Sequence, residues 1–351
     1  MKDYMLANVA QLSEFDALID VRSPSEFAED HLPGAINLPV LDDEQRARVG
    51  TLYSQVSPFE AKKLGAALIA RNIADHLEQH LLDRPKSWRP LVYCWRGGKR
   101  SGSLTHILRE IGWDACRLDG GYKTFRRTVI ADLHAKPSAF QWRVLCGPTG
   151  SGKSRLLRAL EAAGEQVLDL EALAAHRGSL LGHLPGQGQP AQKWFETLVW
   201  SKLRQFSAAR PVYVEAESRK VGALHVPESV LNAMYVAPCL RLETPLPVRV
   251  ALLKEEYAHF LAQPDLLKQA LRPLVVRYGR ERVAEWDAKA DAGDWDGLVE
   301  ALLVQHYDPA YTRSMQQHYP QLDVGATLQP EGAGEPAFSR LAAGLSAAVS
   351  L

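Results

Sequence analysis

The chain has 351 residues, a hydrophobic fraction of 46%, and 41 basic against 41 acidic side chains. One hydrophobic core rarely serves a chain of this length, so we expect two domains. The balanced charge excludes a protein that binds nucleic acid through overall basicity, so a polyanion must meet a local basic patch. No apolar run is long enough to span a membrane and no signal segment opens the chain, so we expect a cytoplasmic protein.

The first 133 residues alternate between strand and helix patterns. Strands are expected over residues 17–21, 34–40 and 90–95, with a short further strand near Cys116. Ser23 and Glu26 form a capping box, and Pro24 occupies the first helical position, so a helix is expected to start here. Further helices are expected over 58–82 and 101–111. This alternation predicts an α/β domain with a parallel sheet covered on both faces.

After a predicted linker over 134–141, the pattern of strand, glycine loop and helix begins again. We expect a second α/β domain over 142–315, whose last part, from about Pro245, is mostly helical in pattern. The remaining residues, 316–351, form a C-terminal tail, which beyond Pro330 is rich in Gly, Ala, Pro and Ser and is expected to be loosely ordered.

The segment GPTGSGKS, Gly147 to Ser154, follows an apolar strand and precedes a helix, which is the context that a phosphate-binding P-loop requires. Its backbone N–H groups are expected to wrap an anion, Lys153 to reach outer phosphate oxygens, and Ser154 to hold Mg²⁺. The predicted binding residues are Gly147, Thr149, Gly150, Ser151, Gly152, Lys153 and Ser154. The motif predicts a bound di- or triphosphate and leaves hydrolysis open.

A magnesium ion at this loop needs an acidic partner. Glu215 and Glu217 in VYVEAES are the predicted partners, and Asp169 at the end of another strand is an alternative.

The segment LVYCWRGGKRSGS places Cys94 at the end of an apolar strand, before a glycine pair and a helix. The other three cysteines, Cys116, Cys146 and Cys239, are expected to be inert, and the lack of a Cys-x-x-Cys pair argues against a zinc site or disulfides. A loop at a helix N-terminus favours a thiolate and a bound anion, and Arg96 and Arg100 are expected to hold a tetrahedral oxyanion.

The upstream segment LIDVRSPSEFAEDHLPGAINLPV resembles the first signature of the rhodanese family through Asp20, Arg22 and HLPGAINLP. Cys94 then lies at the position of that family's persulfide cysteine. The loop from Cys94 to Arg100 is longer than in many rhodaneses and resembles the phosphatases that share the fold, so its length leaves both chemistries open.

Taken with the phosphate loop, the segments YCWRGGKRS, LDGGYKTFRR, GQGQPAQKWFE and VEAESRKVG resemble the bacterial tRNA 2-selenouridine synthase family over residues 10–315. This resemblance implies a transferase with a rhodanese-like domain joined to a P-loop domain, and it favours chalcogen transfer over phosphatase chemistry. It implies that the sulfur of wobble 2-thiouridine in tRNAs for Lys, Glu and Gln is geranylated from geranyl diphosphate. Selenium from selenophosphate then replaces the geranylthio group through a selanylated Cys94, and the selenophosphate-producing enzyme is a possible partner.

Two basic segments are the expected tRNA contacts. Their residues are Lys268, Arg272, Arg277 and Arg280 in the helical region and Lys123, Arg126 and Arg127 before the linker. Trp95, next to Cys94, is expected to stack on the extruded uridine or on the geranyl chain. The glycine-rich segment 178–196 is expected to act as a lid with contacts from Gln189, Gln192 and Lys193.

Three alternative functions follow from the same motifs. A P-loop kinase or ATPase with a regulatory rhodanese module would turn over nucleotide independently of Cys94. A tRNA-binding sulfur-relay protein would bind tRNA without producing a modified nucleoside. A phosphatase would act through Cys94 without tRNA.

Overall fold

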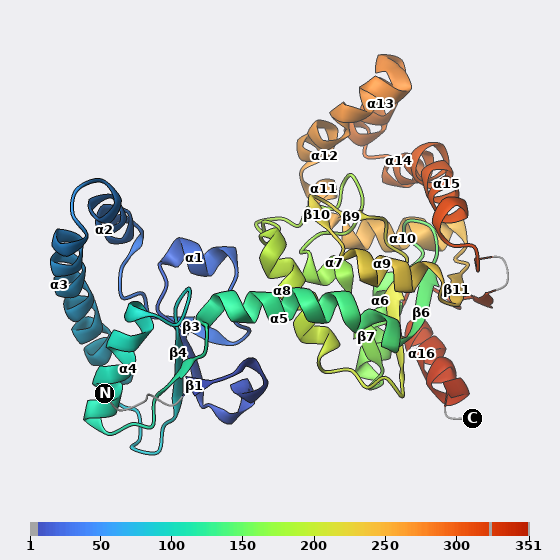
Figure 1. Cartoon of the computed structure of the whole chain (residues 1–351). Helices are drawn as coiled ribbons and strands as arrows, with labels where there is room; N and C mark the ends of the chain where they lie inside the picture. The colour runs from blue at the N-terminus through green and yellow to red at the C-terminus, as the bar shows by residue number, and fades with distance from the viewer. Residues whose placement is uncertain (1–5, 323–324, 350–351) are drawn as a thin grey trace. The chain divides into compact units, whose positions relative to one another are not determined.

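The computed structural model describes residues 6–322 and 325–349 of the chain. Two compact units emerge from the contacts between residues (Figure 1). The first unit runs to Asp132 and also takes in Ala191–Ser201, and the second holds Leu133–Pro190 and continues from Lys202. The predicted linker segment 134–141 contains the end of one helix, a 3-10 turn and the first residue of a strand.

The first unit contains a five-stranded parallel sheet in the order β1-β5-β4-β2-β3. Its strands are β1 (Leu6–Ala7), β2 (Ala17–Asp20), β3 (Ala35–Asn37), β4 (Pro90–Tyr93) and β5 (Cys116–Leu118). All four residues of β4 are buried, as a central strand between two covered faces requires. The α/β architecture predicted for this half of the chain is confirmed.

Helices make the crossovers that a parallel sheet needs. They are α1 (Pro24–Glu29), α2 (Asp43–Gln55), α3 (Pro58–His76), α4 (Lys99–Ile111) and α5 (Gly121–Ala135). The capping box predicted for α1 is present, with Ser23 at the N-cap, Pro24 in the first position and Glu26 reaching back to the cap. A π-helical turn, Leu77–Leu81, continues α3 and accounts for the long helix predicted there.

Most of helix α8 (Gln192–Leu203) belongs to the first unit, although the chain reaches it only after the phosphate loop. Trp194 stacks on His31 at 3.9 Å, and Arg126 pairs with Glu196. This association is not predictable from the sequence, because nothing local to residues 191–201 indicates which sheet they pack on.

The second unit has its own five-stranded parallel sheet in the order β12-β11-β6-β8-β7. Its strands are β6 (Gln141–Cys146), β7 (Gln166–Leu168), β8 (Pro211–Glu215), β11 (Cys239–Leu242) and β12 (Ala326–Leu328). A short antiparallel pair, β9 (Lys220–Val221) and β10 (Leu224–His225), follows β8. Because β6, β7 and β8 are parallel neighbours, the segments that follow them meet at one edge of the sheet.

The expectation of a loosely ordered tail is wrong. Strand β12 extends the sheet beside β11, and helix α16 (Glu335–Val349) packs on α6 (Lys153–Ala162). Phe338 is 1% exposed and joins Ala342 in the core around β6 and α6. The small residues that suggested disorder instead let this helix lie close to its neighbour.

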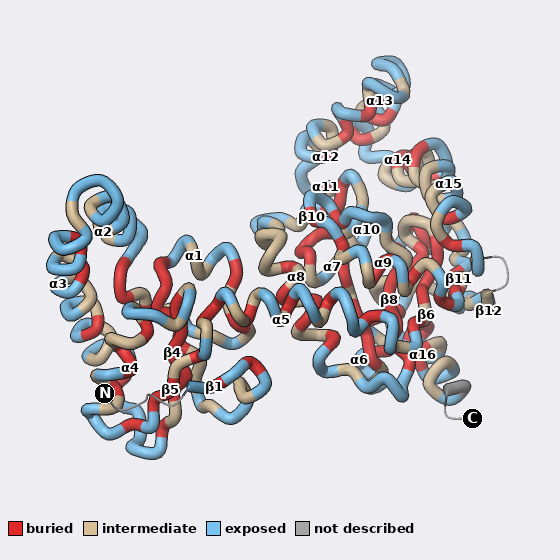
Figure 2. The backbone as a smooth tube through the Cα atoms, viewed as in Figure 1, coloured by how far each residue is buried: buried red, intermediate tan, exposed pale blue. Residues whose placement is uncertain are grey.

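The helical region expected after Pro245 forms a second core beside the sheet. Its helices are α10 (Leu246–Glu256), α11 (Ala258–Ala262), α12 (Pro264–Leu271), α13 (Val275–Asp291), α14 (Trp295–Leu302) and α15 (Asp308–His318). Trp286, 1% exposed, lies at the centre of a cluster that includes Phe260, Leu267 and Leu298. Figure 2 shows this inner stripe as buried while the outer faces of α12 and α13 are exposed. Within the described residues, no helix combines the length and hydrophobicity needed to cross a membrane.

Candidate functional site

The phosphate loop joins the end of β6 at Cys146 to the start of α6 at Lys153, as predicted. Gly150 and Gly152 have φ values of +78° and +90°, a region that only glycine occupies without strain. A Cβ at Gly150 would lie 2.8 Å from the Leu253 side chain. Glycine is therefore required here by backbone conformation and by close packing.

Side chains from several elements hold the loop in place. The Lys153 ammonium donates to the Gly147 carbonyl at 2.7 Å, and the Thr244 hydroxyl donates to the Ser151 carbonyl at 2.7 Å. Arg249 donates two hydrogen bonds, of 2.8 and 3.0 Å, to the Thr149 carbonyl and is itself paired with Asp308. The loop is thus preorganised, with Lys153 at its mouth.

A chain of hydrogen bonds connects the loop to half-buried Glu171 and buried Glu215. The Ser154 hydroxyl donates to Glu171 at 3.1 Å, and the backbone N–H of Glu171 donates to Glu215 at 2.8 Å. Glu171 lies in the short helix α7 (Leu170–Leu173) after β7, and Glu215 ends β8. Glu215 is one of the partners predicted from the sequence, whereas Glu171, two residues after the candidate Asp169, is not.

These carboxylates have raised pKa values. Burial, reinforced by neighbouring carboxylates, raises the pKa of Glu171 to about 7 and that of Glu217 to about 8. Burial also places the pKa of Glu215 well above its usual range, and one oxygen of Glu215 is buried without a hydrogen-bond partner. A positive charge at this edge of the sheet would relieve both costs.

The residues fit a Mg²⁺ ion held with a phosphate, as the sequence predicts for Ser154. Within the described residues, no group of three or more His, Cys, Asp or Glu side chains is arranged as a complete metal site. Mg²⁺ commonly takes only one or two protein carboxylates together with phosphate oxygens and water. Ser154 and Glu171 are the groups that would hold it, with Glu215 behind them. Asp169 instead caps α7 by accepting from the Ala172 N–H at 2.8 Å.

A polar cavity of about 590 Å³ lies over the loop. Lys153, Ser154, Glu171 and Glu217 line it, and Gly178 and Ser179 from the predicted lid segment lie at its rim. Gln189, the predicted lid contact, instead binds the backbone of Ala174, Val221 and Ala223. The start of the glycine-rich segment therefore borders the cavity, whereas Gln189 fixes its far end.

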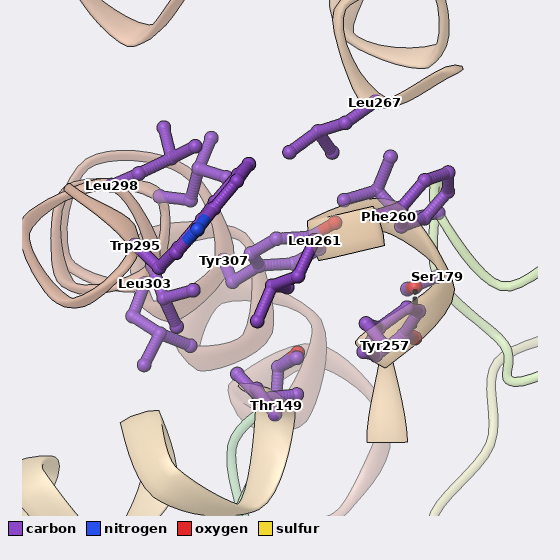
Figure 3. A pocket seen from close by; sticks show the side chains of 14 residues that line it. Thr149, Ser179, Tyr257, Phe260, Leu261, Leu267, Trp295, Leu298, Leu303 and Tyr307 are labelled. Carbon is purple, nitrogen blue, oxygen red and sulfur yellow. Dashed lines mark hydrogen bonds between the residues drawn. The ribbon is translucent and has the colours of Figure 1, made fainter. Parts of the chain in front are cut away.

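A second, apolar cavity adjoins the first on the side of the helical region (Figure 3). Its walls come from α10, α11, α12, α14 and the turn Leu303–Tyr307. Thr149 of the phosphate loop lies at one end, and Leu267 and Leu298 lie toward the other.

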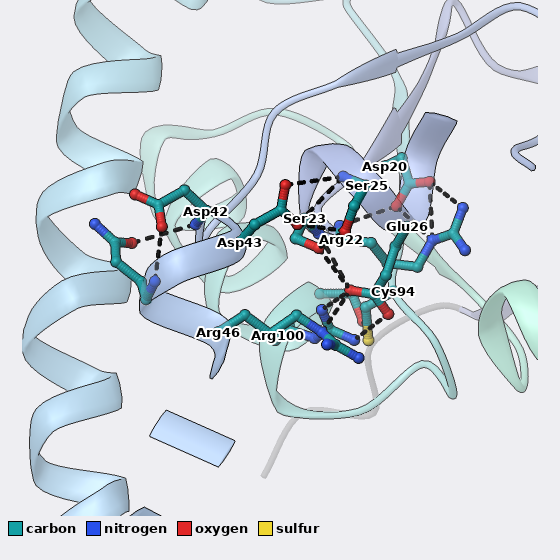
Figure 4. Close-up of polar contacts among 12 residues, drawn as sticks. Asp20, Arg22, Ser23, Ser25, Glu26, Asp42, Asp43, Arg46, Cys94 and Arg100 are labelled. Carbon is teal, nitrogen blue, oxygen red and sulfur yellow. Dashed lines mark hydrogen bonds and ion pairs between the residues drawn. The ribbon is translucent and has the colours of Figure 1, made fainter. Parts of the chain in front are cut away.

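Cys94 follows β4 and precedes α4, as predicted, and is 4% exposed. Figure 4 shows Cys94 near Arg100 and Glu26. The Cys94 Sγ lies 3.3 Å from the Ser101 hydroxyl, which donates to the Gly98 carbonyl at 3.2 Å. The Ser101 hydroxyl therefore sits between the sulfur and the loop backbone.

The GGY segment after β5 clamps the Cys94 loop. The backbone N–H of Tyr122 donates to the Cys94 carbonyl at 2.9 Å, and that of Lys123 donates to the Trp95 carbonyl at 3.0 Å. A Cβ added at Gly121 would collide with the Cys94 carbonyl and the Gly97 nitrogen. The segment LDGGYK is thus part of the frame of the cysteine loop.

The two predicted anion-binding arginines differ in their surroundings. Arg96 is exposed, whereas Arg100 donates to Glu26 at 2.7 Å, and Arg46 approaches the same carboxylate at 2.9 Å. Burial opposes ionisation of Glu26, but the hydrogen bond and charge of Arg100 outweigh it and lower the pKa of this carboxyl. Arg96 is free to turn toward an anion, whereas Arg100 must share its charge with Glu26.

The residues of the rhodanese signature make contacts that stabilise the first unit. Arg22 and Asp20 form a buried pair at 2.6 Å, and Arg22 also donates to the Asp30 carbonyl at 2.6 Å. His31 binds the Phe27 carbonyl through Nδ1 at 2.9 Å and stacks on two aromatic rings, and burial lowers its pKa. Each of these groups is occupied by structural contacts.

The predicted tRNA contacts fall into two classes. Lys123, Arg127, Arg272, Arg277 and Arg280 are exposed. Lys268 is paired with Asp265 and Asp291, and half-buried Arg126 binds Glu196 and the Lys193 carbonyl. The half-buried ring of Trp95 lies 5.3 Å from that of Tyr122.

Comparison with known proteins identifies both units. A family model described as the tRNA 2-selenouridine synthase AAA domain matches residues 140–326, and a rhodanese-like domain model matches residues 5–128. The tRNA 2-selenouridine synthase of Nitrosomonas europaea is 36% identical over 291 residues, which cover 81% of this chain and 75% of that protein. The protein of that name from Alcanivorax borkumensis is 35% identical over 326 residues, covering 84% of this chain and 88% of the relative. This chain therefore belongs to the tRNA 2-selenouridine synthase family.

Proposed function

We propose that this chain is a transferase that converts wobble 2-thiouridine to 2-selenouridine in tRNAs for Lys, Glu and Gln. In the first step the sulfur is geranylated from geranyl diphosphate, and in the second step selenium from selenophosphate replaces the geranylthio group. Relatives named for this product match the chain across both units.

One observation carries the proposal for the first step: the phosphate loop borders both a buried acidic cluster and an apolar cavity. An allylic diphosphate carries an anionic end and a hydrocarbon end that suit these two environments. The sulfur forms a bond to geranyl C1, the C1–O bond breaks, and diphosphate leaves with the electron pair while N3 of the base loses its proton. Lys153 and the loop N–H groups would neutralise the leaving diphosphate.

Mg²⁺, where bound, would supply further positive charge to the diphosphate oxygens. Ser154 and Glu171 are the side chains that would hold it, and Glu215 orients Glu171 through the backbone N–H. Nothing in this step requires nucleotide hydrolysis.

Electron balance constrains the second step. A selanylated Cys94 formed from selenophosphate with release of phosphate would need a two-electron oxidant, because phosphorus would otherwise leave in a reduced state. In a balanced route, the selenium lone pair attacks C2 of the base and geranylthiol leaves after protonation. Cys94 then attacks phosphorus, the P–Se bond breaks toward selenium, and water releases phosphate from the cysteine. We therefore propose Cys94 as the acceptor of the phosphoryl group.

The surroundings of Cys94 support this role. Arg96 and the loop N–H groups would bind the phosphoryl oxygens, and Arg100 would add charge from its pair with Glu26. The Ser101 hydroxyl, 3.3 Å from Sγ, can donate to the thiolate once its single proton turns away from the Gly98 carbonyl.

Nucleoside mass spectrometry tests the proposal. A tRNA carrying 2-thiouridine is incubated with geranyl diphosphate without ATP, and then with selenophosphate, using wild type, Cys94→Ala and Lys153→Ala. We expect geranylation by wild type and Cys94→Ala, its loss in Lys153→Ala, and selenium incorporation only by wild type. A Cys94 peptide that carries phosphorus, without the isotope pattern of selenium, would support the balanced route.

One result would contradict the proposal. If wild type modifies no base without ATP but hydrolyses nucleotide, the substrate proposed for the phosphate loop is wrong.

A further inference from the structure

We infer that the apolar cavity beside the phosphate loop binds the hydrocarbon chain of the allylic diphosphate and sets the chain length that the protein accepts. This inference rests on the proposed function, since it assigns a subsite for the same substrate. It concerns residues of the helical region, about which the motifs of the sequence say nothing.

The wall of the apolar cavity consists mainly of hydrocarbon side chains. Leu267, Leu298, Leu302 and Phe260 meet around the cavity, and all four are at most 8% exposed. An apolar cavity of this kind stays dry and accepts hydrocarbon. The ribose and base of a nucleotide would lose their hydrogen bonds to water there without replacement, which is costly. The wall therefore favours a prenyl chain over a nucleotide.

The apolar cavity is continuous with the polar cavity over the phosphate loop. Thr149, Ser179, Leu253, Tyr257 and Tyr307 line both the apolar and the polar cavity. A molecule whose diphosphate lies on the loop can therefore extend its tail past these residues toward Leu298. The residues at the boundary would surround the carbon next to the diphosphate.

The carbon that reacts, next to the diphosphate, would lie at the boundary between the two cavities. Positive charge develops on an allylic carbon as its bond to diphosphate oxygen breaks. Tyr257 and Tyr307 bring two aromatic rings to the boundary, and the Tyr257 hydroxyl is held by Ser179 at 3.4 Å. Aromatic rings attract cations, so these two side chains suit the developing charge.

The size of the cavity makes chain length selective. Its volume is about 50 Å³, whereas an engineered apolar cavity that binds benzene measures about 150 Å³. A ten-carbon chain therefore enters only if the wall moves outward. Helices α11 and α12, which carry Phe260 and Leu267, are short and meet at Gln263, so they are the elements that can yield. Leu298 on α14 lies at the end distant from Thr149 (Figure 3) and would limit the length.

The test compares five-, ten- and fifteen-carbon allylic diphosphates as donors to 2-thiouridine tRNA. Leu298→Phe should lower kcat/KM for the ten-carbon donor relative to the five-carbon donor by about tenfold. Leu298→Ala should instead raise the ratio of the fifteen- to the ten-carbon donor. Val236→Phe, at a position that is 75% exposed and outside the cavity wall, is the control and should keep the wild-type ratios. Binding of inorganic diphosphate should be equal in all four proteins.

The results distinguish failure of the proposed hydrocarbon subsite from failure of the proposed function. If wild type transfers a prenyl group but both Leu298 variants keep its chain-length ratios, the subsite is wrong and the proposed function stands. If wild type transfers no prenyl group from any donor, the proposed function fails, and the inference fails with it. Because the two substitutions at Leu298 are expected to act in opposite directions, misfolding of one variant leaves the other as a test.

Discussion

The Cys94 loop and the phosphate loop each follow a buried parallel strand and precede a helix, but arginine side chains surround the first and carboxyl groups surround the second. Beside Cys94 lie Arg96 and Arg100, and the nearby Glu26 is already paired with arginine. Beside Lys153 lie buried Glu215 and half-buried Glu171 and Glu217, whose pKa values are raised.

This difference indicates how each loop accepts an anion. The arginines of the cysteine loop suit a small tetrahedral anion without help from a metal ion. When they are ionised, the carboxyl groups near the phosphate loop would repel a diphosphate unless a cation lies between them. A loop between a strand and a helix thus lies beside cationic side chains at one site and beside carboxyl groups that would need a bound cation at the other.

The largest effect is expected from Gly121→Ala, which disturbs the packing of the Cys94 loop and leaves the phosphate loop unchanged. The new Cβ would collide with the Cys94 carbonyl, and φ is +60° at this position. We expect selenium incorporation to fall by at least about a hundredfold, since small displacements of reacting groups have effects of this size. Geranylation should remain, as measured by nucleoside mass spectrometry.

Gly34→Ala is the matched control for Gly121→Ala. Gly34 has a φ of +78°, but a Cβ there meets nothing within 4 Å. It imposes a similar backbone strain without the collision, so selenium incorporation should stay close to wild type. Equal losses in the two variants would mean that strain, and not the clamp on Cys94, explains the effect.

Glu171→Gln tests the need for a cation at the phosphate loop. We expect the apparent affinity for Mg²⁺ in geranylation to fall by about 10- to 100-fold, because groups that hold or orient metal ligands typically have effects of this size. Selenium incorporation into tRNA that is already geranylated should be unchanged. Glu300→Gln, at an exposed position on α14, is the control. Full geranylation by Glu171→Gln at low Mg²⁺ would contradict the assignment.

Several of these features could be predicted from the sequence. Gly150, Gly152 and Lys153 form a pattern whose backbone geometry is nearly independent of the rest of the fold. Cys94 was placed by the apolar strand before it and the helix after it. In both cases the information lies within a few neighbouring residues.

Other features depend on contacts between distant segments. Glu171 reaches Ser154 only because β6, β8 and β7 are neighbours in that order. Arg126 was expected to bind tRNA, but residues 191–201 pack in the first unit and bring Glu196 to it. The apolar cavity arises from the packing of five separate segments, which no local pattern encodes.

The raised pKa values predict how stability depends on pH. Glu171 and Glu217 keep their protons to about pH 7 and 8 in the folded state, whereas unfolded carboxyls lose them near their ordinary values. Between the ordinary value of 4.5 and these raised values the folded state binds more protons, so the free energy of unfolding falls as the pH rises from about 4.5 to about 8. We expect a loss on the order of 4 kcal/mol for the second unit between pH 6 and 9.

Calorimetry at several pH values checks this dependence. Mg²⁺ with inorganic diphosphate should reduce it, and Glu171→Gln should raise Tm at pH 8 while changing it little at pH 5. A transition of the second unit that is independent of pH would rule out buried protonated carboxyls at the phosphate loop.

The smallest effects are expected for the basic side chains, where exposed residues are compared with paired ones. Arg272, Arg277 and Arg280 are exposed, whereas Lys268 is paired with two aspartates. Replacing the three arginines with alanine should weaken tRNA binding about tenfold at moderate salt. The slope of log K against log salt should become shallower by about 2, since each lost phosphate contact removes somewhat less than one unit. Lys268→Ala should change neither quantity, as measured by salt titration of tRNA binding. An equal effect of Lys268→Ala would mean that its ion pairs open when tRNA binds, and an unchanged slope in the triple variant would exclude this region from the tRNA contact.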